Sequence, residues 1–325
     1  MPPRVHLGVN LNFAKFVYGQ KKAIDIVRDE FGLNLIEAVT DFDFGPTLYQ
    51  TNVEAYRAYY RDIGQHAADR GVGIETVLTF YRDTAAIAHP NADVRESTYI
   101  VGKAMLEAAR CYGARLAGSM PFTMDKEIAG DPKQFKPLFD AAIEIWNRWR
   151  REASDYGLEG LIIEAMSTLR EGCSTIVDTR ETLDAFDRAE SSEPMVPMGL
   201  LYDVGHGISE TESSDPRDRD FEAWIGAFPD RIVEIHLKDT DPLFQATFHF
   251  GSGKGIIDLE KLFRVMRETI TVPRVVMFLE IPGKRARDIG EIESIEEHKR
   301  SIALLHAALE STGYRKDSDT GEWVP

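Results

Sequence analysis

Cysteine is nearly absent from this chain of 325 residues, which has only Cys111 and Cys173. Two cysteines cannot form the disulfide framework of a small secreted domain. Long apolar runs are missing as well, because no stretch approaches the roughly 18 residues of a membrane-spanning helix. A basic segment followed by a long apolar one, typical of a secretory signal, is absent from the N-terminus. We therefore expect a cytoplasmic protein without a membrane partner.

Positive charge is also scarce. The chain has 38 Lys and Arg residues against 54 Asp and Glu residues, which gives a formal net charge of −16. Nucleic-acid binding requires clustered Lys and Arg side chains that face phosphates, so we expect no nucleic-acid partner. A chain of this length buries a substantial core without disulfides. A small-molecule substrate is therefore the first expectation.

Short apolar runs rich in Val, Ile and Leu recur along the chain without a clean alternation of apolar and polar residues. Strands that are buried on both faces of a parallel sheet have this pattern. The expected strands are Val5–Leu11, Leu33–Val39, Val72–Phe80, Ala114–Met120, Gly160–Glu164, Met198–Asp203, Arg231–His236 and Arg274–Glu280. Helical periodicity separates them, and the first four expected helices end at Gly32, Gly71, Gly113 and Gly157, each just before a strand.

Eight strands alternating with about eight helices predict an α/β chain folded as a single (β/α)₈ barrel, the TIM-barrel architecture. An open doubly wound sheet is the structural rival. However, Gly8-Val9-Asn10 leads only to Leu11 and Asn12, without a glycine-rich dinucleotide-binding motif. We expect one domain over residues 1–325, with the barrel at about 5–313 and a peripheral polar tail over 314–325.

Four successive expected strands end on a potential metal ligand. These residues are Glu164, Asp203, His236 and Glu280. In a barrel the carboxyl ends of all strands meet at one rim, where active sites lie. One such residue alone would only mark the exit of a strand to solvent, but four in succession predict a metal site. Three carboxylates and one imidazole suit Mn²⁺, Mg²⁺ or Co²⁺, and Zn²⁺ is a further option.

This ligand set also predicts a chemistry. A divalent cation can bind neighbouring oxygens of a hydroxy-carbonyl compound and acidify the C–H beside the carbonyl. The metal-stabilised enediolate then needs a base to remove the proton and an acid to return one, and Glu164 and Glu280 could do both. Return to the neighbouring carbon isomerises a small aldose or ketose, whereas return to the opposite face epimerises it.

The strand ends resemble those of the xylose-isomerase-like barrel superfamily, in its branch of sugar (phosphate) isomerases and epimerases. The resemblance covers about residues 5–310. Its main motifs are Ile163-Glu164, Asp203-Val204-Gly205-His206, Ile235-His236-Leu237-Lys238-Asp239, Gly251-Ser252-Gly253-Lys254-Gly255 and Leu279-Glu280. The resemblance implies that Glu164, Asp203, His236 and Glu280 are the metal ligands and that His206 contacts a substrate oxygen. It also implies a homo-oligomer, either a dimer or a tetramer.

Other functions remain open within the resemblance. Ketose 3-epimerases carry a substrate-contacting arginine shortly after the residue that matches His236, where this chain reads Asp239-Thr240-Asp241-Pro242. The alternative is a metal-dependent dehydratase of a keto-polyol such as an inosose, because it shares the initial proton removal. A DNA-repair endonuclease of the same superfamily would need extra histidines after the second and third strands. Those positions read Ala38-Val39-Thr40-Asp41 and Leu78-Thr79-Phe80-Tyr81.

Several further residues are candidates for substrate binding or support of the ligands. Besides His206, the expected substrate contacts are His89, Lys238, Phe13 and Lys254. Aromatic residues that could wall the pocket follow the first three strands, at Phe13, Phe16, Phe42, Phe44, Phe80 and Tyr81. Glu37 and Glu234 are strand carboxylates that we expect inside the barrel, and Glu234 shares a strand face with His236, which it could support.

Overall fold

The computed structural model of the chain describes residues 1–15, 17–39, 45–79, 87–189, 193–206, 213, 215–241, 247–282 and 290–325. Contacts group the chain into two units. Unit 1 consists of Met1–Glu37, Ala67–Gly73 and Leu200–Pro325, and unit 2 consists of Ala38–His66 and Ile74–Gly199. Among the described residues, no helix is both long and apolar enough to cross a lipid bilayer.

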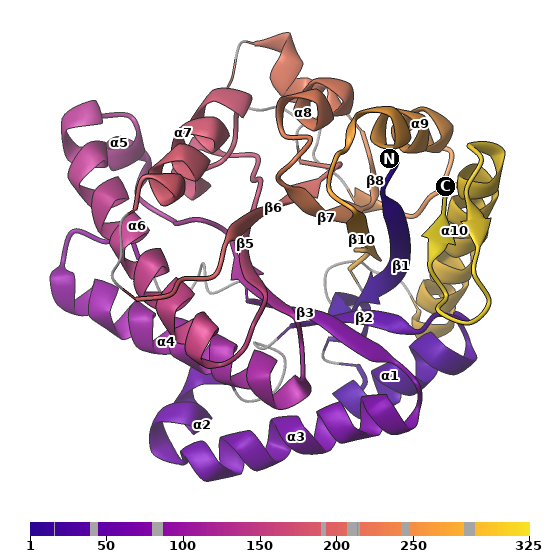
Figure 1. Ribbon diagram of the computed structural model, residues 1–325, viewed down its shortest axis with the longest axis horizontal. Coiled ribbons are helices and arrows are strands. Elements are labelled where there is room, and N and C mark those ends of the chain that lie inside the picture. Colours follow the sequence, from indigo (N-terminus) through magenta and orange to yellow (C-terminus); the bar gives the residue numbers. More distant parts are fainter. Residues whose placement is uncertain are drawn as a thin grey trace. The chain divides into compact units, whose positions relative to one another are not determined.

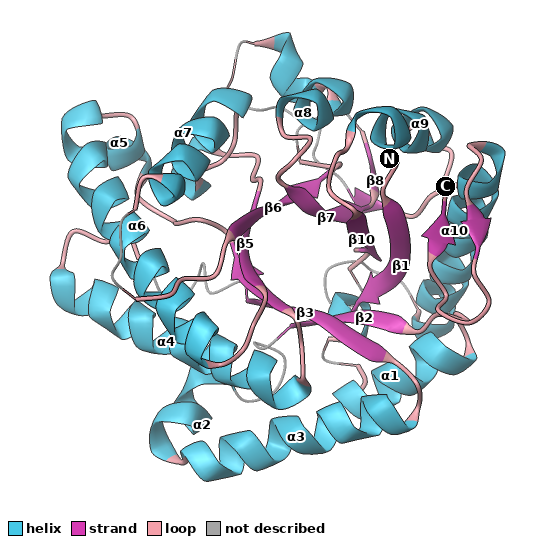
Figure 2. Cartoon of the chain, viewed as in Figure 1, coloured by secondary structure: helices cyan, strands magenta, loops and turns pink. Residues whose placement is uncertain are grey.

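The main sheet has the order β10-β7-β6-β5-β4-β3-β2-β1-β12-β11, and an additional pairing joins β10 to β1. This pairing closes eight parallel strands into the barrel that the sequence predicts (Figure 2). The eight strands are β1 (Arg4–Asn10), β2 (Leu35–Val39), β3 (Gly73–Thr79), β4 (Leu116–Ser119), β5 (Gly160–Glu164), β6 (Met198–Asp203), β7 (Ile232–Leu237) and β10 (Arg274–Leu279). Every expected strand is confirmed, with small differences at the ends.

Helices alternate with these strands (Figure 1). They are α1 (Gln20–Asp29), α2 (Gly45–Thr51), α3 (Val53–Asp69), α4 (Ala92–Tyr112), α5 (Lys126–Ala129), α6 (Pro132–Asp155), α7 (Ile176–Asp187), α8 (Phe221–Ala227), α9 (Leu259–Thr269) and α10 (Glu291–Ser311). Short 3₁₀ helices are η1 (Leu11–Ala14), η3 (Leu169–Glu171) and η4 (Pro216–Arg219). The expected helix-ending glycines all have positive φ: 65° at Gly32 and Gly71, 74° at Gly113 and 77° at Gly157. The left-handed turns predicted there are confirmed.

In unit 1, β1 pairs in parallel with β10, and their registers match Val9 with Leu279. The approach of the strands is so close that a Cβ atom on Gly8 would lie 2.6 Å from the Leu35 carbonyl oxygen and 2.7 Å from Phe278 Cε1. A larger residue at position 8 would therefore push neighbouring elements apart. Glycine here allows the dense packing of the barrel wall.

The polar C-terminal tail contacts the barrel through two short strands. It forms β11 (Arg315–Lys316) and β12 (Trp323–Val324), and β12 pairs antiparallel with β1 through Val5 and Trp323. The Trp323 side chain is only 1% exposed. Backbone pairing and burial of this aromatic ring thus attach the tail to the first strand, whereas residues 315–322 are exposed or partly exposed.

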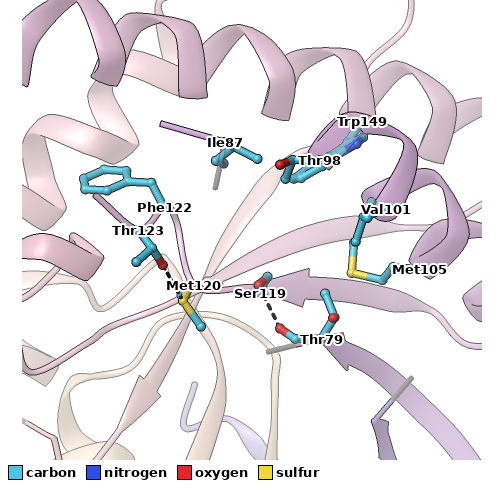
Figure 3. Close-up of a pocket in the computed structure, with 11 residues that line it drawn as sticks. Thr79, Ile87, Thr98, Val101, Met105, Ser119, Met120, Phe122, Thr123 and Trp149 are labelled. Carbon is cyan, nitrogen blue, oxygen red and sulfur yellow. Dashed lines mark hydrogen bonds between the residues drawn. The ribbon is translucent and has the colours of Figure 1, made fainter. Parts of the chain in front are cut away.

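Unit 2 contains β3–β5 and the helices between them. Tyr56, Tyr60 and Ile63 of α3 are buried, and the Tyr56 hydroxyl donates a hydrogen bond of 2.7 Å to the Ala104 carbonyl of α4. A cavity of about 30 Å³ lies at the ends of β3 and β4, where Thr79, Ser119 and Trp149 are among its lining residues (Figure 3). This volume holds about two water molecules and is far too small for a sugar.

Candidate metal centre

Three of the four predicted metal ligands lie in unit 1, at the carboxyl ends of neighbouring parallel strands. Asp203 is the last residue of β6 and pairs in register with His236 of β7. Glu280 follows β10, and its N–H donates to the Leu237 carbonyl at 2.9 Å, which continues the strand pairing. Asp203 and His236 are fully buried, and Glu280 is 8% exposed. Each of the three offers a ligand atom within 4.8 Å of the others.

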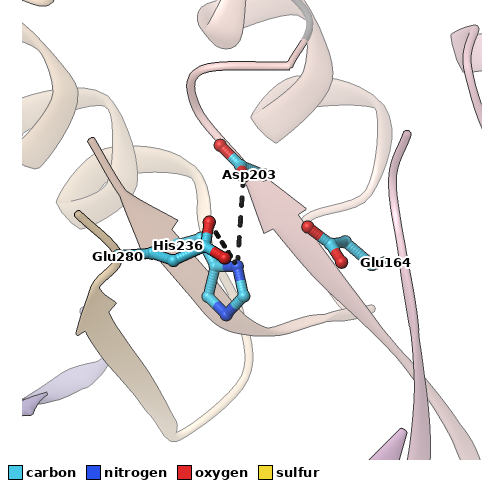
Figure 4. Close-up of side chains that lie close together, drawn as sticks. All are labelled: Glu164, Asp203, His236 and Glu280. Atoms are coloured by element: carbon cyan, nitrogen blue, oxygen red, sulfur yellow. Dashed lines mark ion pairs between the residues drawn. The ribbon is translucent and has the colours of Figure 1, made fainter. Parts of the chain in front are cut away.

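The imidazole of His236 faces both carboxylates (Figure 4). Its Nδ1 atom lies 3.9 Å from Asp203 Oδ2 and 3.4 Å from Glu280 Oε2. Two ligand atoms that are each about 2.1 Å from one ion can be at most about 4.2 Å apart. Both distances are therefore compatible with one shared ion. Because the donors are two carboxylate oxygens and one imidazole nitrogen, they fit a divalent cation such as Mn²⁺, Mg²⁺ or Co²⁺.

Glu164, the fourth predicted ligand, is the last residue of β5 in unit 2 and is 1% exposed. Strand β5 follows β6 in the order of the sheet. Figure 4 draws Glu164 together with the three residues of unit 1. These four buried side chains are groups that could hold a metal ion.

A carboxylate inside the barrel contacts the other nitrogen of His236. The Nε2 atom lies 2.9 Å from Glu37 Oε2 and 3.9 Å from Glu234 Oε1. Glu37 also accepts a hydrogen bond from the Asn10 side-chain amide, and all of these side chains are fully buried. A proton on Nε2 that is donated to Glu37 leaves the Nδ1 lone pair directed at Asp203 and Glu280. The expected supporting residue, Glu234, lies farther from the ring than Glu37.

A lysine ammonium group lies between two of the predicted ligands. Lys238 Nζ is 2.5 Å from Asp203 Oδ2, 3.1 Å from Glu280 Oε2 and 3.2 Å from His206 Nε2. Burial opposes ionisation of Glu280, but the positive charge of the neighbouring Lys238 counters it most strongly, and the Glu280 pKa stays well below its usual range. Glu280 is therefore ionised at neutral pH, as both a metal ligand and a catalytic base must be.

His206 follows Asp203 by three residues, and its Nε2 atom lies 3.4 Å from Asp203 Oδ2. Its side chain is 20% exposed, whereas that of Asp203 is fully buried. The structure thus places His206 and Lys238, both expected to contact substrate, directly beside the predicted ligands. Their roles toward a substrate stay predictions.

The remaining expected substrate contacts are placed differently. Phe13 is 3% exposed and packs against Phe31 and His298, with ring centroids 5.4 Å and 5.1 Å away, as a core residue does. His89 precedes α4 in unit 2 and accepts the Asn91 N–H at Nδ1. Lys254 is exposed, with Nζ 5.7 Å from the centre of the Phe248 ring. A substrate role for these three residues stays a prediction.

Of the aromatic residues expected to wall the pocket, five lie outside the described residues. They are Phe16, Phe42, Phe44, Phe80 and Tyr81.

One residue with a structural role at the site was missed by the sequence reasoning. Asp239 is 6% exposed, and its Oδ1 accepts the N–H groups of Thr240 and Ile257. A Cβ atom on Gly255 would lie only 1.8 Å from the Asp239 carboxyl carbon. The glycine-rich segment is therefore held against β8 (Asp239–Thr240), directly after β7. The signal was present in the sequence, because Asp239 ends the His236 motif and Gly255 ends the glycine run.

Comparisons with known proteins agree with this architecture. A family model described as "Xylose isomerase-like TIM barrel" matches residues 26–307. A D-erythrulose 1-phosphate 3-epimerase from Brucella abortus (strain 2308) is 26% identical over 255 residues, which are 76% of this chain and 79% of the relative.

Two solved structures share the fold. A protein of Rhodospirillum rubrum ATCC 11170, named provisionally as a xylose isomerase, superposes with a TM-score of 0.81 at 19% identity, over 93% of this chain and 99% of its own. A D-psicose 3-epimerase from Clostridium cellulolyticum H10, solved with D-tagatose, superposes with a TM-score of 0.68 at 15% identity. That match also covers 93% of this chain and 99% of the other chain.

Proposed function

The chain belongs to the xylose isomerase-like TIM barrel family, and on this basis we propose that it is a divalent-metal-dependent sugar isomerase or epimerase. Its substrate would be a small aldose or ketose, free or phosphorylated. The observation that carries this proposal is the convergence of Asp203, His236 and Glu280, whose ligand atoms lie within 4.8 Å of one another. The relative from Brucella abortus is an epimerase of a phosphorylated ketose, which favours epimerisation beside a carbonyl.

Glu164 would complete the ligand set. It is a buried carboxylate at the end of β5, the strand beside β6 in the sheet order. When bound, the divalent cation would polarise the substrate carbonyl and so acidify the neighbouring C–H. With Glu164 the site has three carboxylates and one imidazole, a donor set that favours Mn²⁺, Mg²⁺ or Co²⁺ over softer metals.

The order of the strands supports an acid–base pair made of two glutamates. Strands β7 and β6 lie between β10 and β5 in the sheet order, and in the proposed site Glu280 and Glu164 would flank Asp203 and His236. Because Glu280 is ionised, its carboxylate can accept a proton from carbon. Epimerisation requires removal of the proton from one face and return to the other, which two carboxylates on opposite sides can perform.

Two side chains beside the ligands would orient the substrate. His206 has a partly exposed ring, and Lys238 Nζ lies 3.2 Å from its Nε2 atom. Both can donate hydrogen bonds to hydroxyl or carbonyl oxygens. Complete burial of Asp203 and His236 keeps bulk water away from them, which strengthens electrostatic interactions at the reacting centre.

Incubation of the protein with Mn²⁺ and a panel of sugars in D₂O, followed by NMR, tests the proposal. The panel includes D-erythrulose 1-phosphate, ketopentoses and ketohexoses. We expect deuterium beside the carbonyl and a stereoisomer or positional isomer of unchanged carbon skeleton and oxygen content. Glu280→Gln and Glu164→Gln should keep the fold and lose the exchange, whereas Glu75→Gln, which alters a buried carboxylate of β3, should exchange as the wild type does.

A chelator should abolish the exchange, and added Mn²⁺, Mg²⁺ or Co²⁺ should restore it. Full activity of the metal-free protein would overturn the metal-dependent mechanism. Wild-type exchange rates in Glu280→Gln and Glu164→Gln would remove both residues from the acid–base role. Loss of water from a keto-polyol with formation of an enone would instead identify a dehydratase.

A further inference from the structure

We propose that Lys238 competes with the divalent cation for Asp203 and Glu280, so that the cation must displace its ammonium group in order to bind. This inference rests on the proposed metal-dependent function. It assigns Lys238 a role toward the cation that is distinct from its expected contact with substrate. The lysine would act as an internal counter-ion that sets the apparent affinity of the site.

The competition follows from the oxygen atoms that are shared. Lys238 Nζ lies 2.5 Å from Asp203 Oδ2 and 3.1 Å from Glu280 Oε2. These same two oxygens face His236 Nδ1, at 3.9 Å and 3.4 Å. An ion about 2.1 Å from Asp203 Oδ2 would lie no more than about 4.6 Å from the ammonium group. Two cations that close repel strongly in a buried site, so they cannot both keep these positions.

The turn after β6 is shaped to admit the lysine. A Cβ atom on Gly205 would lie 2.6 Å from Cε and 2.8 Å from Cγ of Lys238. The aliphatic part of the lysine therefore passes directly over the glycine. The Gly205 N–H also donates a hydrogen bond of 2.7 Å to Asp203 Oδ1, which leaves Oδ2 for the ammonium group. The glycine at position 205 thus leaves the space that the Lys238 side chain occupies.

The structure also offers the ammonium group a place to move to. His206 Nε2 lies 3.2 Å from Lys238 Nζ, and the His206 ring is partly exposed. The four-carbon stem of lysine is flexible, so a small rotation can separate Nζ from Asp203 and keep it beside His206. A cation that enters would therefore move the ammonium group toward the solvent side, where a substrate oxygen could accept its hydrogen bond.

Titration of the chelator-treated protein with MnCl₂ by calorimetry tests this inference. We expect Lys238→Met to bind Mn²⁺ at least tenfold more tightly than the wild type, which equals about 1.4 kcal/mol. Without Mn²⁺ its melting temperature should be lower, because two buried carboxylates lose their counter-ion, and Mn²⁺ should raise that temperature by more than in the wild type. The control Lys299→Met removes a partly exposed lysine that is paired with Glu30 at 2.7 Å, and this variant should bind Mn²⁺ as the wild type does.

Gly205→Ala is an independent variant that tests the competition between Lys238 and Mn²⁺ even if Lys238→Met does not fold. The added methyl group should displace the lysine stem and also tighten Mn²⁺ binding. Unchanged or weaker Mn²⁺ binding in Lys238→Met would overturn the competition and leave the proposed function intact. If only Gly205→Ala folds, the same result in that variant has the same meaning. Absence of Mn²⁺ binding in the wild type and all variants would instead overturn the metal site itself.

Discussion

Replacement of Glu37 by glutamine tests whether the barrel interior sets the metal affinity. Glu37 Oε2 lies 2.9 Å from His236 Nε2, and it also accepts a hydrogen bond from Asn10. Glu37→Gln keeps the size and shape of the side chain but removes its charge. The His236 ring would then be held by a neutral acceptor at most, and its Nδ1 atom would be a weaker and less well oriented ligand.

The magnitude can be estimated in two ways. Changes to groups that hydrogen-bond a metal-ligating histidine typically weaken metal binding by about 10–100-fold, or about 1.4–2.7 kcal/mol. A hydrogen bond to a charged group contributes about 1.5–3 kcal/mol to stability. Since Glu37 and His236 are fully buried, solvent does not screen their interaction, and the two ranges agree. We therefore expect the Kd for Mn²⁺ to rise by about 10–100-fold.

Calorimetric titration with MnCl₂ measures the change, and thermal unfolding shows whether the fold is kept. Glu75→Gln is the matched control, because Glu75 is also a buried strand carboxylate but pairs with Arg115. We expect that variant to lose stability while its Kd for Mn²⁺ stays at the wild-type value. A Kd for Glu37→Gln equal to that of the wild type would refute the idea that the His236–Glu37 contact tunes the site.

Two further predictions concern stability. Gly102→Ala should destabilise unit 2 by about 1–3 kcal/mol, because its Cβ would lie 2.0 Å from Trp149 Cε2. Gly226→Ala in α8 should instead stabilise the protein by up to about 1 kcal/mol, because a Cβ there would meet no described atom within 4 Å apart from its chain neighbours and its own helix backbone. Equal melting temperatures of the two variants would contradict the packing argument. Burial lowers the pKa of His306 to about 4, so the folded state favours the neutral imidazole. The contribution of this residue to the free energy of unfolding is therefore fully present above pH 6.5 and is lost as the pH falls toward 4. His306→Phe should therefore lose less stability than the wild type between pH 7 and pH 5 in thermal unfolding, and an equal loss would contradict this assignment.

Most of the barrel could be predicted because each strand is a short apolar run and four of the helices before a strand end at a glycine. The C-terminal hairpin could not be predicted in this way. Strand β12 has only two residues, Trp323 and Val324, so it shows no periodicity. Its pairing partner, Val5, lies at the other end of the chain. Only the folded barrel shows that an edge of β1 is available to it.

The same limit applies to the metal centre. Convergence of Asp203, His236 and Glu280 follows from the general rule that parallel strands end at one rim. The contact of Glu37 with His236 joins residues 199 positions apart, and it depends on how far each side chain reaches across the barrel. Likewise, the sequence predicted that Lys238 contacts a substrate but did not show that it bridges the carboxylates of Asp203 and Glu280. The direction of this side chain depends on the neighbouring charges and on the space that Gly205 leaves.

The pairing of Val5 with Trp323 has a consequence for the order in which the sheet can form. Strand β1 is separated from its partners β10 and β12 by most of the other strands of the sheet, so these two pairings join segments that are far apart in the sequence. Contacts between such distant segments form slowly, and unpaired strand edges can aggregate meanwhile. The edges of β1 that β10 and β12 cover should therefore be among the last parts of the sheet to be paired during folding.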